Sequence, residues 1–150
     1  MNKAILFIFS GLPAVGKSTL AKSVVKHFGA VYLRIDTIEQ GLKDLCFINV
    51  EGEGYRLAYR MAADNLQLGN NVVADCCNPI ELTRQEWEDV AVNNNCRFVN
   101  IEVVCSDKTE HKKRAEQRYA EVANMKLPVW NDIENLNYKH KMANRKAQEI

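Results

Sequence analysis

Two kinds of hydrophobic pattern follow each other along the chain. Residues 4–9 are apolar without alternation, which is typical of a strand that helices cover on both faces of a parallel sheet. Over residues 17–28, apolar side chains recur about every four positions, which predicts an amphipathic helix that ends at Gly29. A short apolar run at residues 31–35 predicts a second strand. The chain therefore starts with a strand, a helix and a strand.

The same order continues along the chain. We expect further strands over residues 71–75 and 97–104, and helices over 37–46, 55–68, 79–94 and from Ser106 or Asp107 to about Val122. Strands that alternate with helices of this length predict right-handed crossovers and a parallel sheet between two layers of helices. The sequence therefore predicts an α/β fold with three layers.

The pattern changes near the C-terminal end of the sequence. Residues 106–124 are rich in charge, and this pattern predicts a lid-type region built on a helix. After Pro128, residues 131–150 contain no apolar run that would predict a fifth strand, and we expect them to form an atypical tail. No linker or repeat divides the sequence, so we expect one domain over residues 1–150.

Composition excludes several classes of protein. The 150 residues carry 20 Lys and Arg against 19 Asp and Glu, so no overall charge attracts the protein to nucleic acid or to an acidic membrane. None of the five cysteines forms a Cys-x-x-Cys pair, which is typical of reduced thiols in a cytoplasmic protein. The N-terminal apolar run ends at a glycine loop without a cleavage pattern, so we interpret it as a buried strand rather than a signal peptide. We expect a cytoplasmic protein.

A glycine-rich loop joins the first strand to the first helix. The stretch "GLPAVGKST" matches the P-loop, or Walker A, pattern Gly-x-x-x-x-Gly-Lys-Ser between a strand and a helix. We expect Lys17 to reach the terminal phosphates of ATP, and the Ser18 hydroxyl to bind Mg²⁺. The alternative is a glycine turn with a chance lysine. The residues that would surround the nucleotide are Gly11, Leu12, Pro13, Ala14, Val15, Gly16, Lys17, Ser18 and Thr19.

Two carboxylates follow predicted strands at the edge of the sheet where ligands bind in open α/β folds. Asp75 comes after "VVA" and is a candidate for holding Mg²⁺, directly or through water. Asp36 follows the second strand and is a candidate for accepting the proton of an acceptor hydroxyl. A helix cap or a solvated strand end is the alternative for each of them.

The last predicted helix carries a cluster of basic residues. Arg114 and Arg118 are four residues apart, so we expect both to project from one helix face and to stabilise the charge of a transferred phosphoryl group. The alternative is a solvated face on which acidic residues balance the arginines; these are Glu110, Glu116 and Glu121.

Several of these segments together resemble a known family. "GLPAVGKSTLAK", "GAVYLRIDTIEQ" and "VVCSDKTEHKKRAEQR" are similar to bacterial P-loop kinase-like proteins, described as AAA-family ATPases or as adenylylsulfate-kinase-like. Chloramphenicol phosphotransferase, zeta toxin, gluconate kinase and polynucleotide kinase are related to them. The resemblance covers about residues 3–130 and implies a sheet of order 2-3-1-4-5, ATP and magnesium, Asp36 as the base, and lid arginines at Arg114 and Arg118. With the fifth strand absent, the expected order is 2-3-1-4.

The sequence departs from these relatives at two places. Polynucleotide kinases have an arginine for the acceptor's phosphate where this chain has Glu39, which argues against an anionic acceptor. Relatives also continue after a "PxW" element into a final strand and helix, whereas this sequence has "NYKHKMANRKAQEI". The residues that we expect around the acceptor are Asp36, Glu39, Tyr55, Arg56 and Asn78.

These observations predict an ATP-dependent kinase that phosphorylates a hydroxyl group of a small molecule. One alternative is a nucleotide-binding switch or a degenerate ATP-binding protein without turnover. A second is a nucleotide, polynucleotide or adenylylsulfate kinase. We expect neither a membrane nor a nucleic acid as partner, and a second copy of the chain could pair with an exposed sheet edge beside the fourth strand.

Overall fold

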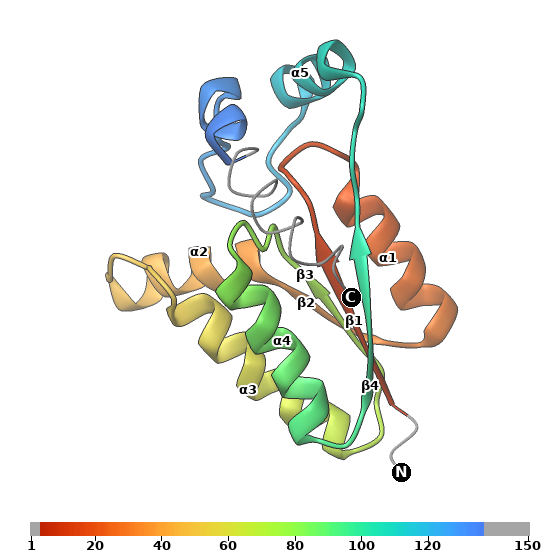
Figure 1. The fold of residues 1–150 in the computed structure, drawn as a ribbon. Helices are drawn as coiled ribbons and strands as arrows, with labels where there is room; N and C mark the ends of the chain where they lie inside the picture. Colours follow the sequence, from red (N-terminus) through yellow and green to blue (C-terminus); the bar gives the residue numbers. More distant parts are fainter. Residues whose placement is uncertain (1–3, 137–150) are drawn as a thin grey trace.

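A parallel sheet of four strands forms the centre of the protein (Figure 1). The structure, a computed structural model, describes residues 4–136. Within this part of the chain the strands are β1 (Ile5–Ser10), β2 (Val31–Arg34), β3 (Val72–Asp75) and β4 (Arg97–Glu102). They lie in the order β2-β3-β1-β4, and each pair is parallel. This confirms the predicted α/β fold and the strand order 2-3-1-4.

Helices cover the sheet on both sides, as Figure 1 shows. Helix α1 (Lys17–Phe28) packs on one face, while α3 (Glu53–Gln67) and α4 (Glu81–Asn93) pack on the other. Helix α2 (Ile35–Cys46) lies against α3. Helix α5 (Lys108–Gln117) stands beyond the carboxyl ends of the strands, together with a helical segment over residues 130–136.

Strand β1 is buried on both of its faces. Leu6 and Ile8 belong to the core cluster that includes Trp87 of α4, whereas Phe7 and Phe9 pack with Ala21 of α1. Because successive strand residues point to opposite faces, both sets must be apolar, and this explains the run without alternation. Burial of such side chains contributes about 1.5–3 kcal/mol each to folding.

The carboxyl ends of the strands bring distant segments together at one edge of the sheet. The amide of Gly11 donates to the carbonyl of Cys77 over 3.2 Å, which joins the loop after β1 to the loop after β3. The amide of Val103 donates to the carbonyl of Ser10 over 2.9 Å, and this fixes the end of β4 beside the same loop. The loop that starts at Gly11 therefore lies in the middle of this edge.

The structure corrects one predicted boundary. We expected the last charged helix to reach about Val122, but α5 ends at Gln117, and Arg118 has extended backbone angles (φ −77°, ψ 157°). The physical reason is that ion pairs with other elements hold Glu121, so tertiary contacts override helix propensity after residue 117.

The outer edge of β4 is unpaired among residues 4–136, and these residues form no fifth strand. Most of the predicted tail, residues 137–150, lies outside the described residues. No helix of residues 4–136 is both long and apolar enough to cross a membrane.

Candidate active site

The loop between β1 and α1 has a shape that only a few residue types allow. Gly11, Ala14 and Gly16 have positive φ angles of 152°, 67° and 93°. A Cβ atom on Gly11 would lie 2.5 Å from the carbonyl oxygen of Val103, so a side chain there would collide with backbone. This close approach explains why the pattern requires glycine at this position.

A cavity of about 510 Å³ opens over this loop. Its other walls come from the end of β2, from Cys77 and from residues 118–129, a segment that we call the strap. The lining residues are Pro13, Ala14, Gly16, Lys17, Ser18, Thr19, Arg34, Asp36, Cys77, Arg114, Arg118, Tyr119, Glu121, Val122, Met125, Leu127, Pro128 and Leu136. Six of the nine predicted loop residues thus line one cavity; Gly11, Leu12 and Val15 do not line it.

Lys17 lies at the base of this cavity. Its side-chain nitrogen is 3.7 Å from the Asp75 carboxylate and 3.7 Å from the Cys77 sulfur, and the residue is 8% exposed. Burial works against the ammonium, but the interactions with Cys77, Asp75 and Asp36 outweigh burial and raise the Lys17 pKa. Burial raises the pKa of the Cys77 thiol, so that thiol is neutral and the two carboxylates hold the lysine charged. Lys17 is therefore a fixed cation at the floor of the site.

Asp75 at the end of β3 is buried, and its carboxylate is held by hydroxyl donors. The Ser18 hydroxyl donates to Oδ2 over 2.7 Å, and the Tyr32 hydroxyl donates to the same oxygen. Burial and the contact with Asp75 raise the pKa of Tyr32 to about 12, so Tyr32 remains a donor at neutral pH.

The Ser18 and Asp75 pair has the chemistry of a magnesium site. Mg²⁺ is usually bound by one or two protein oxygens together with substrate phosphates and water, rather than by a cage of protein ligands. A hydroxyl and a carboxylate in contact beneath a phosphate loop fit this pattern. Residues 4–136 hold no cluster of three or more His, Cys, Asp or Glu that could bind a metal by itself.

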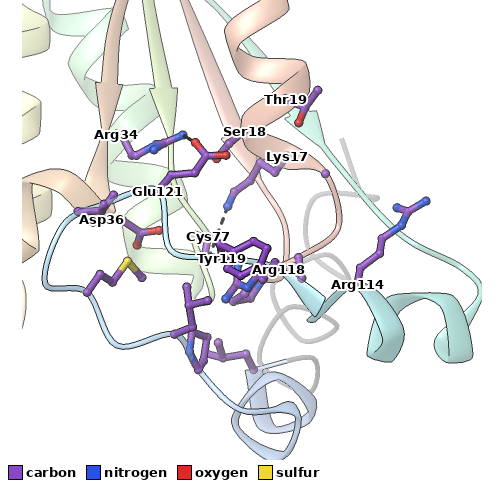
Figure 2. A pocket seen from close by; sticks show the side chains of 18 residues that line it. Lys17, Ser18, Thr19, Arg34, Asp36, Cys77, Arg114, Arg118, Tyr119 and Glu121 are labelled. Carbon is purple, nitrogen blue, oxygen red and sulfur yellow. Dashed lines mark hydrogen bonds and ion pairs between the residues drawn. The ribbon is translucent and has the colours of Figure 1, made fainter. Parts of the chain in front are cut away.

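The two arginines that we expected on one helix face lie in different surroundings. Arg114 is exposed on α5, where its Nε donates to Glu110 over 3.1 Å, and Figure 2 shows it pointing away from the centre of the cavity. Arg118 follows the helix, and its Nε and Nη2 atoms are buried without a hydrogen-bond partner among residues 4–136. Burial lowers the Arg118 pKa, although Asp36 opposes this effect. Both arginines line the large cavity, but Arg118 caps α5 and does not lie within the helix.

Asp36 and Glu39 lie in the first half of α2 and line a second cavity of about 300 Å³. Asp36 and Met125 also line the large cavity, so the two spaces meet at these side chains. Glu39 is half-buried, and burial together with the neighbouring Asp36 raises its pKa. Gly54 of α3 approaches it so closely that a Cβ there would lie 2.5 Å from its Cγ.

The structure does not bring the other three expected acceptor residues to either cavity. Arg56 is exposed and lies 3.7 Å from Glu53 on the same helix. The Tyr55 hydroxyl accepts from the amide of Asn78 over 3.1 Å. The Asn78 side chain is fully buried and donates to the carbonyl of Phe9 over 3.0 Å, so it braces the end of β1. Tyr55 and Asn78 therefore stabilise the strand ends beside the site and do not line it.

The polar residues of β2 and the path of the strap were not predicted from the sequence. Arg34 donates from Nε to the Tyr32 hydroxyl over 2.9 Å and from Nη2 to Glu121 of the strap over 2.9 Å, and Figure 2 shows Arg34 and Glu121 in contact. Lys22 of α1 also donates to Glu121 over 2.7 Å. These bonds, first from Lys22 and then from Arg34, lower the Glu121 pKa to about 2. A signal was present, because two polar residues two positions apart in a short strand share one face.

Comparisons with known proteins agree with this geometry. Residues 6–135 match the family model described as an AAA domain. The chain is similar in structure to a chain of the Pnkp1/Rnl/Hen1 RNA repair complex, with a TM-score of 0.78 and 17% identity, over 97% of this chain and 47% of that one. The chain thus spans about half the length of that relative.

Two further solved structures are similar over most of their length. Chaetomium thermophilum Kti12 in complex with ADP-AlF3 has a TM-score of 0.69 and 20% identity, over 89% of this chain and 79% of that one. Mycobacterium tuberculosis APS kinase CysC in complex with AMPPNP and APS has a TM-score of 0.62 and 18% identity, over 78% and 71%. No curated protein matches the chain in sequence. These structures share the fold of this chain.

Proposed function

The chain belongs to this P-loop kinase-like AAA domain family, and from this premise we propose that it is an ATP-dependent phosphotransferase acting on a hydroxyl group of a small molecule. ATP would bind in the large cavity with its phosphates on the loop between β1 and α1. The acceptor would bind in the second cavity, beside α2. Because family membership and a shared fold do not by themselves assign an activity, the proposal depends on the geometry of the site.

One observation carries the proposal: Asp36 lines both cavities. A base for phosphoryl transfer must reach the acceptor hydroxyl and must also lie near the phosphate that is attacked. A carboxylate at the junction of a phosphate cavity and a second cavity meets both requirements. Asp36 is also exposed to solvent, so a substrate can reach it.

The proposed reaction needs no covalent intermediate on the protein. The acceptor oxygen forms a bond to the γ-phosphorus of ATP, the bond from that phosphorus to the bridging oxygen breaks, and ADP leaves. The hydroxyl proton passes to the Asp36 carboxylate. Lys17 and Arg118 supply positive charge to the phosphoryl oxygens, because both side chains reach the cavity with their charged atoms largely buried. Ser18 and Asp75 would hold Mg²⁺, which offsets charge on the phosphates when it is bound.

The acceptor that this site favours is neutral or positively charged near its hydroxyl group. Asp36 and Glu39 lie side by side on one wall of the second cavity, and the raised Glu39 pKa reflects burial and the charge of Asp36. A third negative charge at this wall would be repelled. Lys43 and Lys126 line the same cavity, so a negative group at another end of the acceptor is compatible with it.

The test compares two aspartate variants in an ADP-release assay with ATP, Mg²⁺ and pools of hydroxyl-bearing metabolites. In wild-type protein one pool should accelerate ADP release. Asp36→Asn should reduce this acceleration by about 100-fold or more, since base catalysis contributes roughly 10²–10⁴-fold, while ATP affinity should change little. Asp64→Asn removes an exposed carboxylate from α3 and serves as the matched control.

One outcome would count against the kinase proposal, and another against the role of Asp36. Wild-type protein that binds ATP but releases ADP at the same rate with every pool would favour a nucleotide-binding switch. Acceleration that survives in Asp36→Asn would show that Asp36 is not the base.

A further inference from the structure

We propose that Tyr32 and Arg34 of β2 are positioning residues for the magnesium site formed by Ser18 and Asp75. The inference rests on the proposed function only in that the site binds a magnesium nucleotide; it needs no acceptor and no turnover. Neither residue belongs to the phosphate loop or to α2. Both act through Asp75, which lies on the neighbouring strand β3.

The first step is the pairing of the two strands. Arg34 and Asp75 are register partners in the parallel pair of β2 and β3, so both side chains leave the sheet at the same level. Tyr32 precedes Arg34 by two residues and therefore lies on the same face of the strand. The guanidinium of Arg34 lies over the Tyr32 ring, 5.4 Å from its centre. This stacking restricts both side chains to one arrangement.

The second step is the direction of the hydrogen bonds. Arg34 Nε donates to the Tyr32 oxygen over 2.9 Å, so the tyrosine uses an oxygen lone pair for Arg34 and its proton for Asp75 Oδ2. Ser18 donates its own proton to the same carboxylate oxygen over 2.7 Å. The lone pairs of the Ser18 hydroxyl are then available for a cation. Tyr32 thus orients the Asp75 carboxylate, which in turn orients the Ser18 hydroxyl.

The third step is burial. Asp75 is 3% exposed, and the Arg34 side chain is 13% exposed although it carries a full charge. A buried polar group costs folding free energy unless it is hydrogen-bonded, so a tyrosine and an arginine placed here require a compensating role. Holding the carboxylate of a metal site is such a role, because partners of metal ligands orient the ligands and tune metal affinity.

The hydrogen bonds of Arg34 continue to Glu121 of the strap. Arg34 Nη2 donates to Glu121, whose carboxylate also binds Lys22 of α1. Glu121 therefore holds the guanidinium in the position from which Nε reaches Tyr32. One continuous series of contacts runs from Glu121 through Arg34, Tyr32 and Asp75 to Ser18 (Figure 2 shows its Glu121 and Arg34 end).

The test measures ADP affinity by calorimetry with and without Mg²⁺ in wild-type protein and in Tyr32→Phe. The variant keeps the ring and removes the hydroxyl that holds Asp75. We expect the Mg²⁺ concentration that gives half of the affinity gain to rise about tenfold, in line with other partners of metal ligands. ADP affinity without Mg²⁺ should stay within about twofold, since Tyr32 does not line the cavity. Tyr59→Phe on α3 is the matched control.

Arg34→Lys provides a second, independent variant. Lysine keeps the charge but lacks the fixed Nε donor, so Mg²⁺ dependence should shift in the same direction. If both residues act through one series of contacts, the double variant should be no worse than the worse single variant.

Three results would overturn the inference. The first is a folded Tyr32→Phe protein whose Mg²⁺ dependence equals that of wild type. The second is a loss of ADP affinity that is equally large with and without Mg²⁺, which would indicate a purely structural role. The third is wild-type protein whose ADP affinity does not respond to Mg²⁺, which would also remove the magnesium part of the proposed function. Failure to find an acceptor would count against the kinase proposal alone.

Discussion

Replacement of Lys17 by methionine tests nucleotide binding separately from the stability of the fold. Methionine is one atom shorter than lysine but is also unbranched and fills most of the same buried space, and it removes the ammonium. Asp75 loses an ion pair at 3.7 Å and keeps the Ser18 and Tyr32 hydroxyls as donors. Because the carboxylate remains hydrogen-bonded, we expect the nucleotide-free variant to lose only about 1–3 kcal/mol and to fold.

The effect on ATP binding should be larger, and its size follows from linkage. ATP at about 100 times its Kd stabilises wild-type protein by ~2.7 kcal/mol, which raises Tm by about 5–11 °C for a chain of this size. A hydrogen bond from a charged donor is worth about 1.5–3 kcal/mol, so its loss weakens binding roughly 10- to 150-fold. The same ATP concentration then stabilises Lys17→Met by only ~0.3–1.3 kcal/mol, or about 1–5 °C.

A thermal-shift titration with ATP measures both effects in one experiment. Lys26→Met is the matched control, because Lys26 is an exposed lysine on the same helix and lies outside the cavity. The control should keep the full shift. If Lys17→Met also keeps the full shift, ATP does not bind at the loop between β1 and α1, and the placement of the nucleotide is wrong.

Three other substitutions probe the same site. Gly11→Ala should lower the free energy of unfolding by about 2–3 kcal/mol in urea denaturation, because its Cβ would lie 2.5 Å from the Val103 carbonyl oxygen at a φ of 152°; an unchanged midpoint would contradict this close approach. Arg118→Gln should leave stability unchanged or higher, since it removes buried guanidinium atoms that have no hydrogen-bond partner in the described part of the chain. It should still weaken ATP binding or turnover about 10- to 100-fold, and equal activity would show that Arg118 does not contact the phosphates. For Glu121, the folded pKa of about 2 lies below the ordinary value of 4.5, so its contribution is complete above that value and is lost as pH falls towards 2. Its side chain is 60% exposed, so screening reduces the effect to about 1 kcal/mol, and wild type should lose that much more stability than Glu121→Gln between pH 5.5 and pH 2.5.

Residues close together in sequence were predicted well. The phosphate loop and the strands follow from glycine spacing and hydrophobic period, which depend on neighbours within a few residues. The strand order came from the resemblance to P-loop kinase-like proteins. The sequence placed Asp36 and Asp75 at the correct edge of the sheet, because the carboxyl ends of parallel strands all lie at one edge. The start of α5 was also correct, since the Asp107 side chain accepts from the amide of Glu110.

The errors lie where the chain leaves regular structure. A charged sequence that is compatible with a helix continues beyond Gln117, but ion pairs of Glu121 with α1 and β2 take the chain across the cavity instead. Tyr55 and Asn78 were expected at the acceptor and instead brace the ends of β1 and β3. Local pattern contains no information on which of two nearby polar side chains faces a cavity.

The sequence alone determined that this protein has a P-loop between a strand and a helix, because the loop's shape depends on its own glycines. Only the tertiary structure decided how the site is completed. The bonds from Ser18 and Tyr32 to Asp75 join residues 57 and 43 positions apart, and the bond from Arg34 to Glu121 spans 87 positions. Contacts over such distances form only when the sheet and the strap have folded together, so no local pattern specifies them.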